Sequence, residues 1–535
     1  MKITYLGHAG FAIEEGETLL VIDPWLGRNG AFDRAWFQFP RNHHLLDELL
    51  GKVRGARHLG LYVSHEHEDH FCRDTLGALC PHSPTAIIAR YRAGDFAALM
   101  RSSGFADIRE LDDGEATDFH DLQVRVFIDE SGINRDSAIL VTDRCGRKFL
   151  NFNDCKIFDR CILLHKLYAP IDVFTCQFTG ATMHPICYEY EEATYRSISR
   201  SKRHAKFRGV RTAIERLQPA IYLPSAGPAA FLDPALFHLN FETEGVFPRS
   251  WEFKAYLDET RCRAEVVQLA PGGWLDVQSD VREGGPRLDL DPRDLRAYLT
   301  RYQADMLGSA APHAPPTDLE AAQHALIAAL QRKLDVYAAF KDRLKMRSNV
   351  YFGLAETSGY IKVDFSACRV TAVDAIAEPA YYLHSTSLER LRDVIAGRMS
   401  WETYFLTFRF RNRRVPDEYD SGVVMFLFAD PDSYRYGMEQ LIRHREGRER
   451  ITVTSMDGRD AYEINRFCPH QGADLKYALV DGETLICPRH HWRFDLADGG
   501  KCTANEDTIR AVKVAADRDL PAAAPALSDG EDRRR

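Results

Sequence analysis

Two short segments near the C-terminus each bring a cysteine and a histidine together at ligand spacing. The first is a Cys-x-His pair, Cys468 and His470, and the second is a Cys-x-x-His pair, Cys487 and His490. Thiolate sulfur and neutral imidazole nitrogen are strong metal ligands, and a short loop can turn both side chains of a pair toward one centre. The stretch YALVDGETLIC between the pairs predicts strands that hold the two loops side by side. We therefore expect these four residues to bind one metal centre.

The spacing resembles that of Rieske [2Fe–2S] proteins, in which one iron takes two thiolates and the other takes two imidazoles. The alternatives are a zinc site and two unrelated surface loops. Zinc ribbons use Cys-x-x-Cys knuckles, and the sequence has none here. The Cys-x-x-His register favours His490 over its neighbour His491 as the ligand. Ala473 and Arg489 stand where respiratory Rieske proteins carry a disulfide, so the resemblance implies the lower-potential type that supplies electrons to an oxygenase iron.

A second cluster lies near the N-terminus, in the segment SHEHEDHF. It contains His65, His67, Asp69 and His70 directly after an apolar run. His65 and His67 alternate at a strand end and can face one metal, and Asp69 and His70 in the next turn can face a second. The pattern resembles the His-x-His-x-Asp-His signature of the metallo-β-lactamase fold, and the upstream YLGHAGF and VIDPW resemble its opening hairpin. A solvated acidic loop is the alternative, which the preceding hydrophobic strand disfavours.

The later ligands that this resemblance implies are irregular. Asp136 stands near the place of the third histidine, Asp154 matches the bridging aspartate, and Ser225 occupies the place of the last histidine. The pattern therefore departs from a standard dizinc hydrolase site and favours a single-metal site. Two histidines and one carboxylate with open positions suit non-haem Fe(II) and oxygen. We expect His65, His67 and Asp154 to be the catalytic iron ligands, with Asp136 competing.

Two further histidines are weaker candidates. His184, in GATMHPICY, precedes a proline, and such a residue is more often a hydrogen-bonded structural or substrate-contact group than a ligand. His8 is far from the other ligands in sequence, and we expect it to support them or to cap a strand.

The elements around these residues predict an α/β multi-domain protein. Short apolar runs bounded by Gly, Asp or Asn predict strands up to about residue 230. We expect a hairpin over residues 1–26 with its turn at EEGE, a strand leading into the His-rich loop over 58–71, strands over 121–129, 137–143, 148–154, 172–178 and 220–228, and a basic helix over 191–217. Strands interleaved with helices favour an αββα sandwich of the metallo-β-lactamase-like type.

We expect four parts in the chain. These are a metallo-β-lactamase-like metal-binding domain over residues 1–245, a helical and α+β middle region over 246–449 with a linker near 306–318, a small all-β Rieske domain over 450–520, and a disordered tail over 521–535. The middle region should contain a long amphipathic helix over 319–345, a helix, a turn and a second short helix over 386–405, and a charged helix over 433–450.

Composition excludes several classes of protein. The 535 residues are 45% hydrophobic and 27% charged, which is enough apolar material for several cores. The net charge of −9 argues against a nucleic-acid partner. We find no signal peptide and no run long enough to cross a membrane, so we expect a cytoplasmic protein whose remaining cysteines are thiols.

Together these segments resemble the CMP-N-acetylneuraminate hydroxylase family, which joins a Rieske domain to a metallo-β-lactamase-like domain. The matching stretches are DSAILV, FLNFNDC, FTGATMHPICY, AIYLPSAGP and the two Rieske loops. In that family the Rieske domain is N-terminal, whereas here it is C-terminal. The resemblance implies a Rieske-type monooxygenase with a [2Fe–2S] cluster and one or two non-haem irons. It would use O2, electrons from a reductase or ferredoxin, and a small, nucleotide-activated or amino-sugar-like substrate; an oligomer is compatible with this chemistry.

Three other functions remain open. The same iron machinery could oxygenate the nitrogen of an amine. Alternatively, a metallo-β-lactamase-fold hydrolase could hold zinc and use the Rieske domain as a redox sensor, or the chain could be a pure electron carrier. The basic stretch over residues 199–211 could bind a phosphate-bearing substrate, although a solvated helix face is the favoured explanation.

Overall fold

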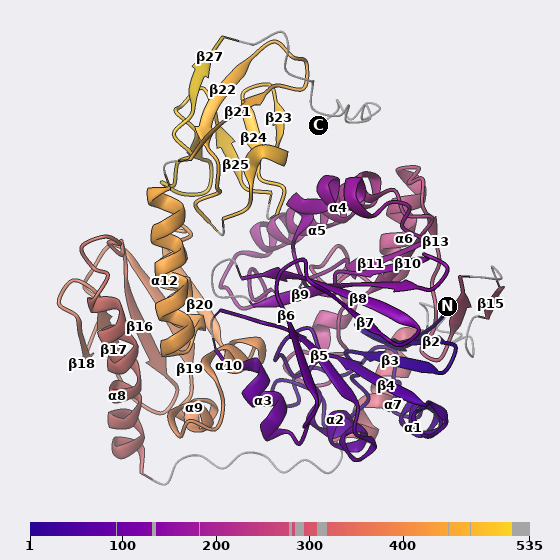
Figure 1. The fold of residues 1–535 in the computed structure, drawn as a ribbon. Helices are drawn as coiled ribbons and strands as arrows, with labels where there is room; N and C mark the ends of the chain where they lie inside the picture. Colours follow the sequence, from indigo (N-terminus) through magenta and orange to yellow (C-terminus); the bar gives the residue numbers. More distant parts are fainter. Residues whose placement is uncertain are drawn as a thin grey trace.

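The computed structural model describes residues 1–92, 94–130, 135–180, 182–277, 281–283, 294–307, 318–447, 449–470, 472–489 and 491–515. The expected tail over 521–535, and residues 308–317 of the expected linker, lie outside these described residues. Figure 1 shows a two-sheet sandwich, a second α+β unit beside it and a small β-rich unit resting over both.

The sandwich consists of two sheets that face one another, with helices on the outer sides (Figure 1). The Phe11 and Phe149 rings, one from each sheet, meet at 5.2 Å in the core between them. This architecture confirms the expected αββα class. The first sheet has the order β15 (Val281–Glu283), β14 (Trp274–Asp276), β1 (Lys2–Gly7), β2 (Gly10–Glu15), β3 (Thr18–Ile22), β4 (His58–Tyr62), β5 (Thr85–Ala89) and β6 (Ile108–Leu111).

The second sheet carries the remaining strands of the sandwich. Its order is β13 (Glu265–Val266), β12 (Ile221–Ser225), β11 (Val173–Gln177), β10 (Lys148–Asn151), β9 (Asp136–Asp143), β8 (Leu122–Asp129) and β7 (Ala116–Phe119). The outer helices are α1 (Leu45–Gly55), α2 (Arg73–Leu79), α3 (Phe96–Ser102), α4 (Cys161–Tyr168), α5 (Glu192–Leu217) and α6 (Ser250–Glu259). The expected basic helix over 191–217 is therefore α5.

Parallel strands decide where the loops meet. Strands β3 and β4 are parallel, as are β10, β11 and β12. Loops that follow parallel strands gather at one edge of a sheet. The loops after β3, β4 and β10 therefore gather at one end of the sandwich, and β9, antiparallel to β10, begins there with Asp136.

The expected N-terminal hairpin has an additional turn. The EEGE turn joins β2 to β3 as expected, but the first arm itself folds into β1 and β2. The chain turns at Gly7 and His8, whose φ angles are 105° and 52°. Glycine enters this region without strain, whereas His8 is an uncommon occupant.

Residues beyond the expected domain boundary at 245 also pack on the sandwich. Strand β14 pairs with β1, β13 pairs with β12, and helix α7 (Leu295–Leu307) packs its Leu299 and Tyr302 against Phe37. We propose that the metal-binding unit extends to about residue 307.

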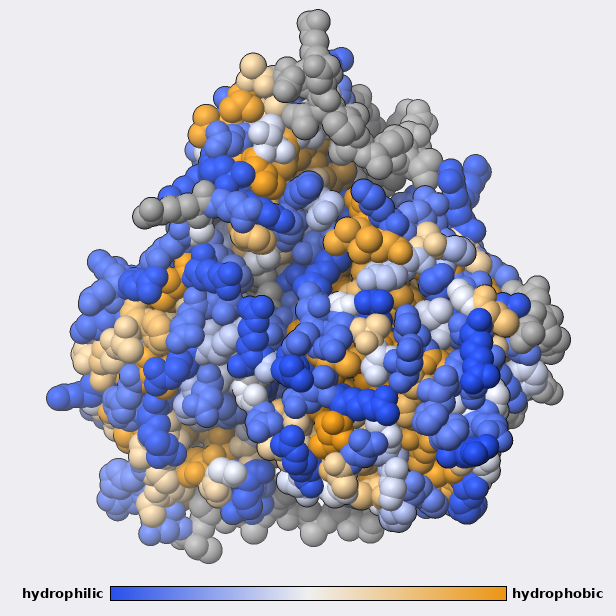
Figure 2. Space-filling model, in the orientation of Figure 1, coloured by the Kyte–Doolittle hydropathy of each residue, from blue (hydrophilic) through white to orange (hydrophobic). Residues whose placement is uncertain are grey.

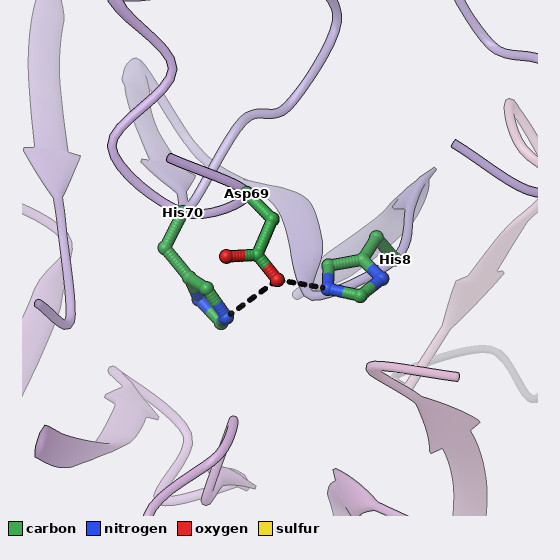
Figure 3. Close-up of side chains that lie close together, drawn as sticks. All are labelled: His8, Asp69 and His70. Atoms are coloured by element: carbon green, nitrogen blue, oxygen red, sulfur yellow. Dashed lines mark hydrogen bonds and ion pairs between the residues drawn. The ribbon is translucent and has the colours of Figure 1, made fainter. Parts of the chain in front are cut away.

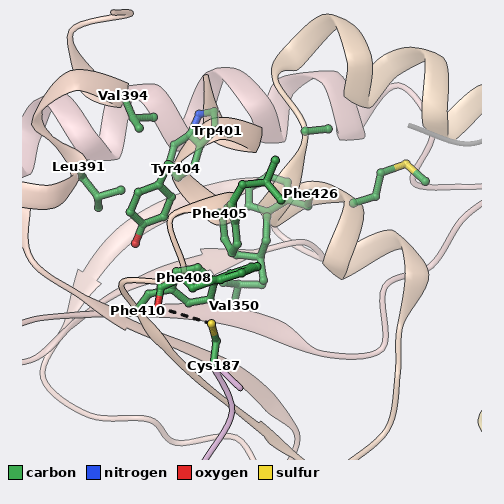
Figure 4. Packing of buried hydrophobic residues seen from close by; sticks show 14 of the residues in the cluster. Cys187, Val350, Leu391, Val394, Trp401, Tyr404, Phe405, Phe408, Phe410 and Phe426 are labelled. Carbon is green, nitrogen blue, oxygen red and sulfur yellow. Dashed lines mark hydrogen bonds between the residues drawn. The ribbon is translucent and has the colours of Figure 1, made fainter. Parts of the chain in front are cut away.

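The second unit is a five-stranded sheet covered by helices. Its order is β18 (Arg369–Val373), β17 (Tyr360–Asp364), β16 (Asn349–Leu354), β19 (Tyr381–Thr386) and β20 (Arg411–Val415), with α8 (Leu319–Ala338), α9 (Leu388–Ile395), α10 (Trp401–Leu406), α11 (Ser421–Phe428) and α12 (Pro431–Glu446). Figure 4 shows Trp401, Phe405 and Phe410 in its core. Cys187 of the sandwich reaches in, and its Sγ lies 3.7 Å from the Phe408 carbonyl oxygen. The two units therefore share one continuous core.

The small unit contains two short sheets around a separate core. One has the order β21 (Arg450–Thr454), β22 (Ala461–Asn465) and β27 (Val512–Val514), and the other has β23 (Leu479–Asp481), β24 (Thr484–Ile486), β25 (Arg493–Asp495) and β26 (Lys501–Cys502). Hydrophilic side chains cover most of the face in Figure 2. Among the described residues, we find no helix that combines the length and apolar character needed to span a bilayer.

Candidate metal centres

The His-rich loop after β4 is held in place by a buried aspartate. Asp23, directly after β3, accepts hydrogen bonds from the Ser64 backbone N–H at 2.8 Å and the Ser64 hydroxyl at 2.7 Å. The same carboxylate lies 2.9 Å from Nδ1 of His70. A bond of this kind fixes the ring and directs the other nitrogen, Nε2, toward a metal.

One group of candidate ligands consists of His65, His70 and Asp154. Their ligand atoms all lie within 4.8 Å of one another. Asp136 stands beside them, with its Oδ1 3.3 Å from His65 Nδ1. His67 is also adjacent, because its Nδ1 is 2.7 Å from His65 Nε2. The structure thus gathers these expected residues at one end of the sandwich, with His70 rather than His67 beside Asp154.

A second group consists of His8, Asp69 and His70, again within 4.8 Å of one another (Figure 3). His8 Nε2 lies 3.0 Å from Asp69 Oδ2, and His70 Nε2 lies 3.8 Å from the same oxygen. The turn between β1 and β2 carries His8 to this position. The signal in the sequence for that turn is a Gly-His pair inside an apolar run, Gly7 and His8.

Glu402 is a member of the site that the sequence did not indicate. It lies on α10 of the second unit, and its Oε1 is 2.9 Å from His67 Nε2. The two residues are 335 positions apart in the chain, and a lone glutamate on a short helix has no distinguishing pattern.

The electrostatics of the site favour a bound cation. Burial disfavours the charged form of both histidines, yet Glu402 raises the pKa of His67 to about 9, and Asp69 and Asp23 raise that of His70 to about 10. Burial and Asp154 hold the pKa of Asp136 well above its usual range. His67, His70 and Asp136 therefore each hold a proton next to a carboxylate, and a metal ion could take the place of these protons.

Unsatisfied buried atoms point the same way. Asp69 Oδ1, His70 Nε2 and Asp154 Oδ1 have no hydrogen-bond partner. A buried polar atom without a partner costs roughly 1–3 kcal/mol, so three of them at one place need an explanation. All three atoms belong to residues of the groups above, and oxygen and imidazole donors of this kind fit non-haem iron.

The other positions discussed from the sequence do not join these groups. Ser225 is buried at the end of β12 and accepts a hydrogen bond from the Thr175 hydroxyl at 2.5 Å. His184 Nε2 lies 2.9 Å from the Tyr190 hydroxyl and 3.2 Å from an Arg414 nitrogen. His184 is therefore a hydrogen-bonded residue in this structure, outside both ligand groups.

A cavity of about 730 Å³ lies elsewhere, between the sandwich and the edge of the second unit's sheet. Arg390, Arg409 and Arg411 line it, but Arg409 already pairs with Asp33 and Asp233. None of the lining residues belongs to a ligand group, so this cavity does not define the active site.

The two C-terminal loops share one backbone design. The Cys468 N–H donates to the Ala473 carbonyl at 3.0 Å, and the Gly472 N–H donates back to Cys468 at 2.8 Å. In the second loop the Cys487 N–H donates to Trp492 at 2.8 Å. The His491 N–H donates back to Cys487 at 3.0 Å. Each cysteine therefore begins a closed turn, and His470 lies within the first of them.

The surroundings of His470 suit a neutral ligand. Its ring stacks on Trp492 with centroids 4.1 Å apart, and the Tyr419 hydroxyl lies 3.4 Å from its Nε2. Burial and the nearby cations Lys156 and Arg489 lower its pKa to about 3. Because the Tyr419 hydroxyl lies beside Nε2, Nδ1 is the nitrogen that would face a metal. Cys468 and Cys487 are buried, whereas the fourth expected ligand, His490, lies outside the described residues.

Comparison with known proteins finds family matches for the small C-terminal unit and for part of the sandwich. Residues 436–515 match the Rieske [2Fe-2S] domain family, and residues 2–134 match the beta-lactamase superfamily domain. Putative Rieske 2Fe-2S iron-sulfur proteins of Mycolicibacterium smegmatis and Mycobacterium tuberculosis are 26% and 28% identical to this chain, covering 96% of it and 100% of each relative. Cytidine monophosphate-N-acetylneuraminic acid hydroxylase of Danio rerio is 26% identical over 78% of this chain and 70% of its own length.

Solved structures resemble about half of this chain, with low TM-scores. An isothiocyanate hydrolase from Delia radicum gut bacteria has a TM-score of 0.35 and 16% identity, covering 52% of this chain and 98% of its own. CmlA, a diiron beta-hydroxylase from Streptomyces venezuelae, has a TM-score of 0.32 and 15% identity, covering 50% of this chain and 53% of its own.

Proposed function

Since this chain joins a metallo-β-lactamase-like domain to a C-terminal Rieske [2Fe–2S] domain, we propose that it is a Rieske-dependent non-haem iron oxygenase. It hydroxylates a small substrate, with nucleotide-activated and amino-sugar-like compounds as the first to test, using O2 and electrons from a reductase or ferredoxin. The observation that carries the proposal is the presence, in one chain, of a Rieske centre and a separate cluster of buried histidines and carboxylates. The cytoplasmic location remains a prediction.

The residues of the N-terminal site have distinct roles in this proposal. His65, His70 and Asp154 hold iron, with His67 and Asp136 completing or adjusting the set. Iron with two histidines, a carboxylate and open positions supplies oxidation by O2. The chain's own groups orient the ligands and keep the site dry.

The cluster is held by the four residues expected from the sequence, Cys468, His470, Cys487 and His490. Burial of both cysteines and the neutral state of His470 fit that role. Electrons enter from an external donor and leave toward the N-terminal site.

The rival functions account for less of the structure. A dizinc hydrolase would use a histidine where Ser225 stands, and here that hydroxyl is bonded to Thr175. A pure electron carrier leaves the buried ligand groups without a use. N-oxygenation of an amine requires the same two centres and remains the second candidate. Only the identity of the substrate distinguishes it from hydroxylation. The hydroxylase name of the Danio rerio relative supports the first candidate.

Substrate-dependent oxygen uptake tests the proposal. Purified protein with NADPH and a generic ferredoxin–reductase pair should consume O2 when a nucleotide sugar or amine is oxidised, and isotopically labelled oxygen should appear in the product. His65→Ala, which removes one of the three ligands of the first group, should abolish the uptake while leaving the Rieske EPR signal unchanged. Uptake that persists in this variant would show that the iron lies elsewhere.

A further inference from the structure

The second cluster loop carries a buried arginine that reaches into the sandwich. Arg489, two residues after Cys487, is 6% exposed. Its Nη1 donates to Asp129 Oδ1 at 3.0 Å, and its Nη2 lies 3.4 Å from Asp159 Oδ1. Both aspartates belong to the sandwich, one at the end of β8 and one in a short helix over Phe158–Arg160. One cation is thus held between two buried anions from the other unit.

Three further contacts join the same face of the Rieske unit to the sandwich. The Asp474 N–H, next to the first cluster loop, donates to Asp159 Oδ2 at 3.2 Å. Arg216 of α5 donates to the Tyr477 carbonyl at 3.1 Å. The ring of His491 lies against Gly209 of α5, so closely that a side chain at Gly209 would collide with it. Both cluster loops therefore rest on the metal-binding unit of their own chain, as Figure 1 shows for the whole unit above α5.

The two aspartates belong to the segments that carry the iron ligands. Asp129 of β8 lies directly opposite Asp136 of β9 in the strand register. Asp159 follows Asp154 by five residues, in the segment that leaves β10. A short stretch of packed protein thus links the Rieske loops to both carboxylates of the iron site.

We propose that Arg489, Asp129 and Asp159 form a clamp that docks the Rieske domain on the iron site of the same chain, so that electron transfer occurs within one subunit. The inference rests on the proposed function and adds the route of the electron to it. One electron leaves the reduced cluster, which becomes oxidised, and one electron is gained by Fe(III), which becomes Fe(II); no atom or proton needs to cross the interface. Arg489 is a positioning residue, because it acts through the placement of the cluster.

The clamp stabilises this interface because the buried charges of Arg489, Asp129 and Asp159 require one another as partners. Removal of Arg489 leaves two carboxylates facing each other away from water, which favours separation of the units. The loss should therefore change the distance between the centres and leave each centre intact.

EPR of the reduced cluster tests this directly. In the wild-type protein, a paramagnetic iron in the N-terminal site should speed the relaxation of the Rieske signal, and zinc in that site should not. Arg489→Leu should lose this difference, and anaerobic reoxidation of its cluster by the iron site should slow on the order of a hundredfold, the scale on which misplaced groups lose rate. Arg459→Leu, an 83%-exposed cation on the same unit, is the matched control and should behave as wild type.

Two additional measurements keep the test decisive. Hydrogen exchange on the metal-free protein should rise in segments 155–160 and 486–492 of Arg489→Leu, and Arg489→Lys should lie between it and wild type. Relaxation enhancement that disappears in the monomeric fraction, or that Arg489→Leu retains in full, would overturn the clamp within one subunit. Enhancement without any oxygen uptake would instead leave the docking intact and refute the oxygenase function.

Discussion

At the scale of single residues, the N-terminal site is a set of histidines held by carboxylates. Asp23 binds His70, and Glu402 binds His67, each at 2.9 Å. Such partners fix the ring and increase the basicity of the nitrogen that faces the metal. Glu402 comes from the second unit, so that unit contributes a side chain to the N-terminal site.

Glu402→Gln should therefore weaken metal binding without removing a ligand. Loss of a carboxylate partner behind a ligating histidine costs about 10- to 100-fold in metal affinity. Competition with an Fe(II) chelator measures the effect. Glu439→Gln, an exposed change on α12, is the control and should bind as wild type. Unaltered affinity in Glu402→Gln would mean that His67 does not act on the metal.

His8 decides whether the site holds a second metal. His8→Asn removes one of the three ligand atoms of the second group and should lower the metal bound per chain by about one equivalent, because a site with two remaining ligands binds weakly. His184→Asn, outside both groups, should leave the metal content unchanged. Equal metal content in both variants would mean that His8 binds no metal and only contacts Asp69.

The residue types of the site were largely predictable, because ligand chemistry leaves a pattern in the sequence. His65, His67, Asp69 and His70 stand together in one loop, and Asp136 and Asp154 followed from the resemblance. His8 and Glu402 were not predictable in this way. The role of His8 depends on a turn whose only signal is one Gly-His pair in an apolar run, and the role of Glu402 depends on packing between two units, which leaves no local pattern.

At the scale of elements, the ends of parallel strands bring distant ligands together. The His-rich loop follows β4, Asp154 follows β10, and Asp136 begins the neighbouring β9. The strands that lead into these loops were predictable from apolar runs bounded by turn residues, whereas β5, β6 and β7 were not predicted. The α8 helix, expected over 319–345, ends at Ala338, because the following residues turn to allow Leu344 to enter the shared core. Apolar spacing alone does not locate such an end.

A histidine on β19 makes the second unit sensitive to acid. His384 is fully buried, with ring nitrogens 2.8 Å from Asn412 Oδ1 and from the Tyr404 hydroxyl, and burial lowers its pKa to about 4. The unfolded chain binds this proton near pH 6.5, so stability is full above that pH and is lost as pH falls toward 4. The loss is roughly 2–3 kcal/mol.

Chemical denaturation between pH 7 and 4.5 measures this dependence. His384→Gln should be less stable at pH 7 but should show a shallower fall with acid, since it lacks the titrating group. An identical pH slope in the variant and the wild type would assign the acid sensitivity to other residues.

At the scale of the whole molecule, two units share a core and the third has its own. Trp25, Phe231, Val350 and Leu441 belong to one continuous cluster that spans the sandwich and the second unit. The Rieske unit has a separate hydrophobic core. Its contacts with the sandwich include the Arg489–Asp129 ion pair and the hydrogen bond from Arg216 to the Tyr477 carbonyl. The sequence indicated three folded parts, but it could not show which of them fuse, because contacts between units depend on surfaces and not on periodicity.

This arrangement predicts the order of unfolding. Removal of the [2Fe–2S] cluster should allow the Rieske unit to unfold by itself. The sandwich and the second unit should continue to unfold together as one cooperative block. Hydrogen exchange on protein with and without the cluster measures it. Separate unfolding of the sandwich and the second unit would contradict the shared core.

The proposed function requires that one chain carry both a Rieske cluster and a non-haem iron site. Metal and acid-labile sulfide analysis of anaerobically purified protein, with EPR after dithionite reduction, tests it most directly. We expect about three or four irons and about two labile sulfides per chain, with a Rieske-type signal. Two irons accompanied by stoichiometric zinc would contradict it and favour a hydrolase with a redox sensor.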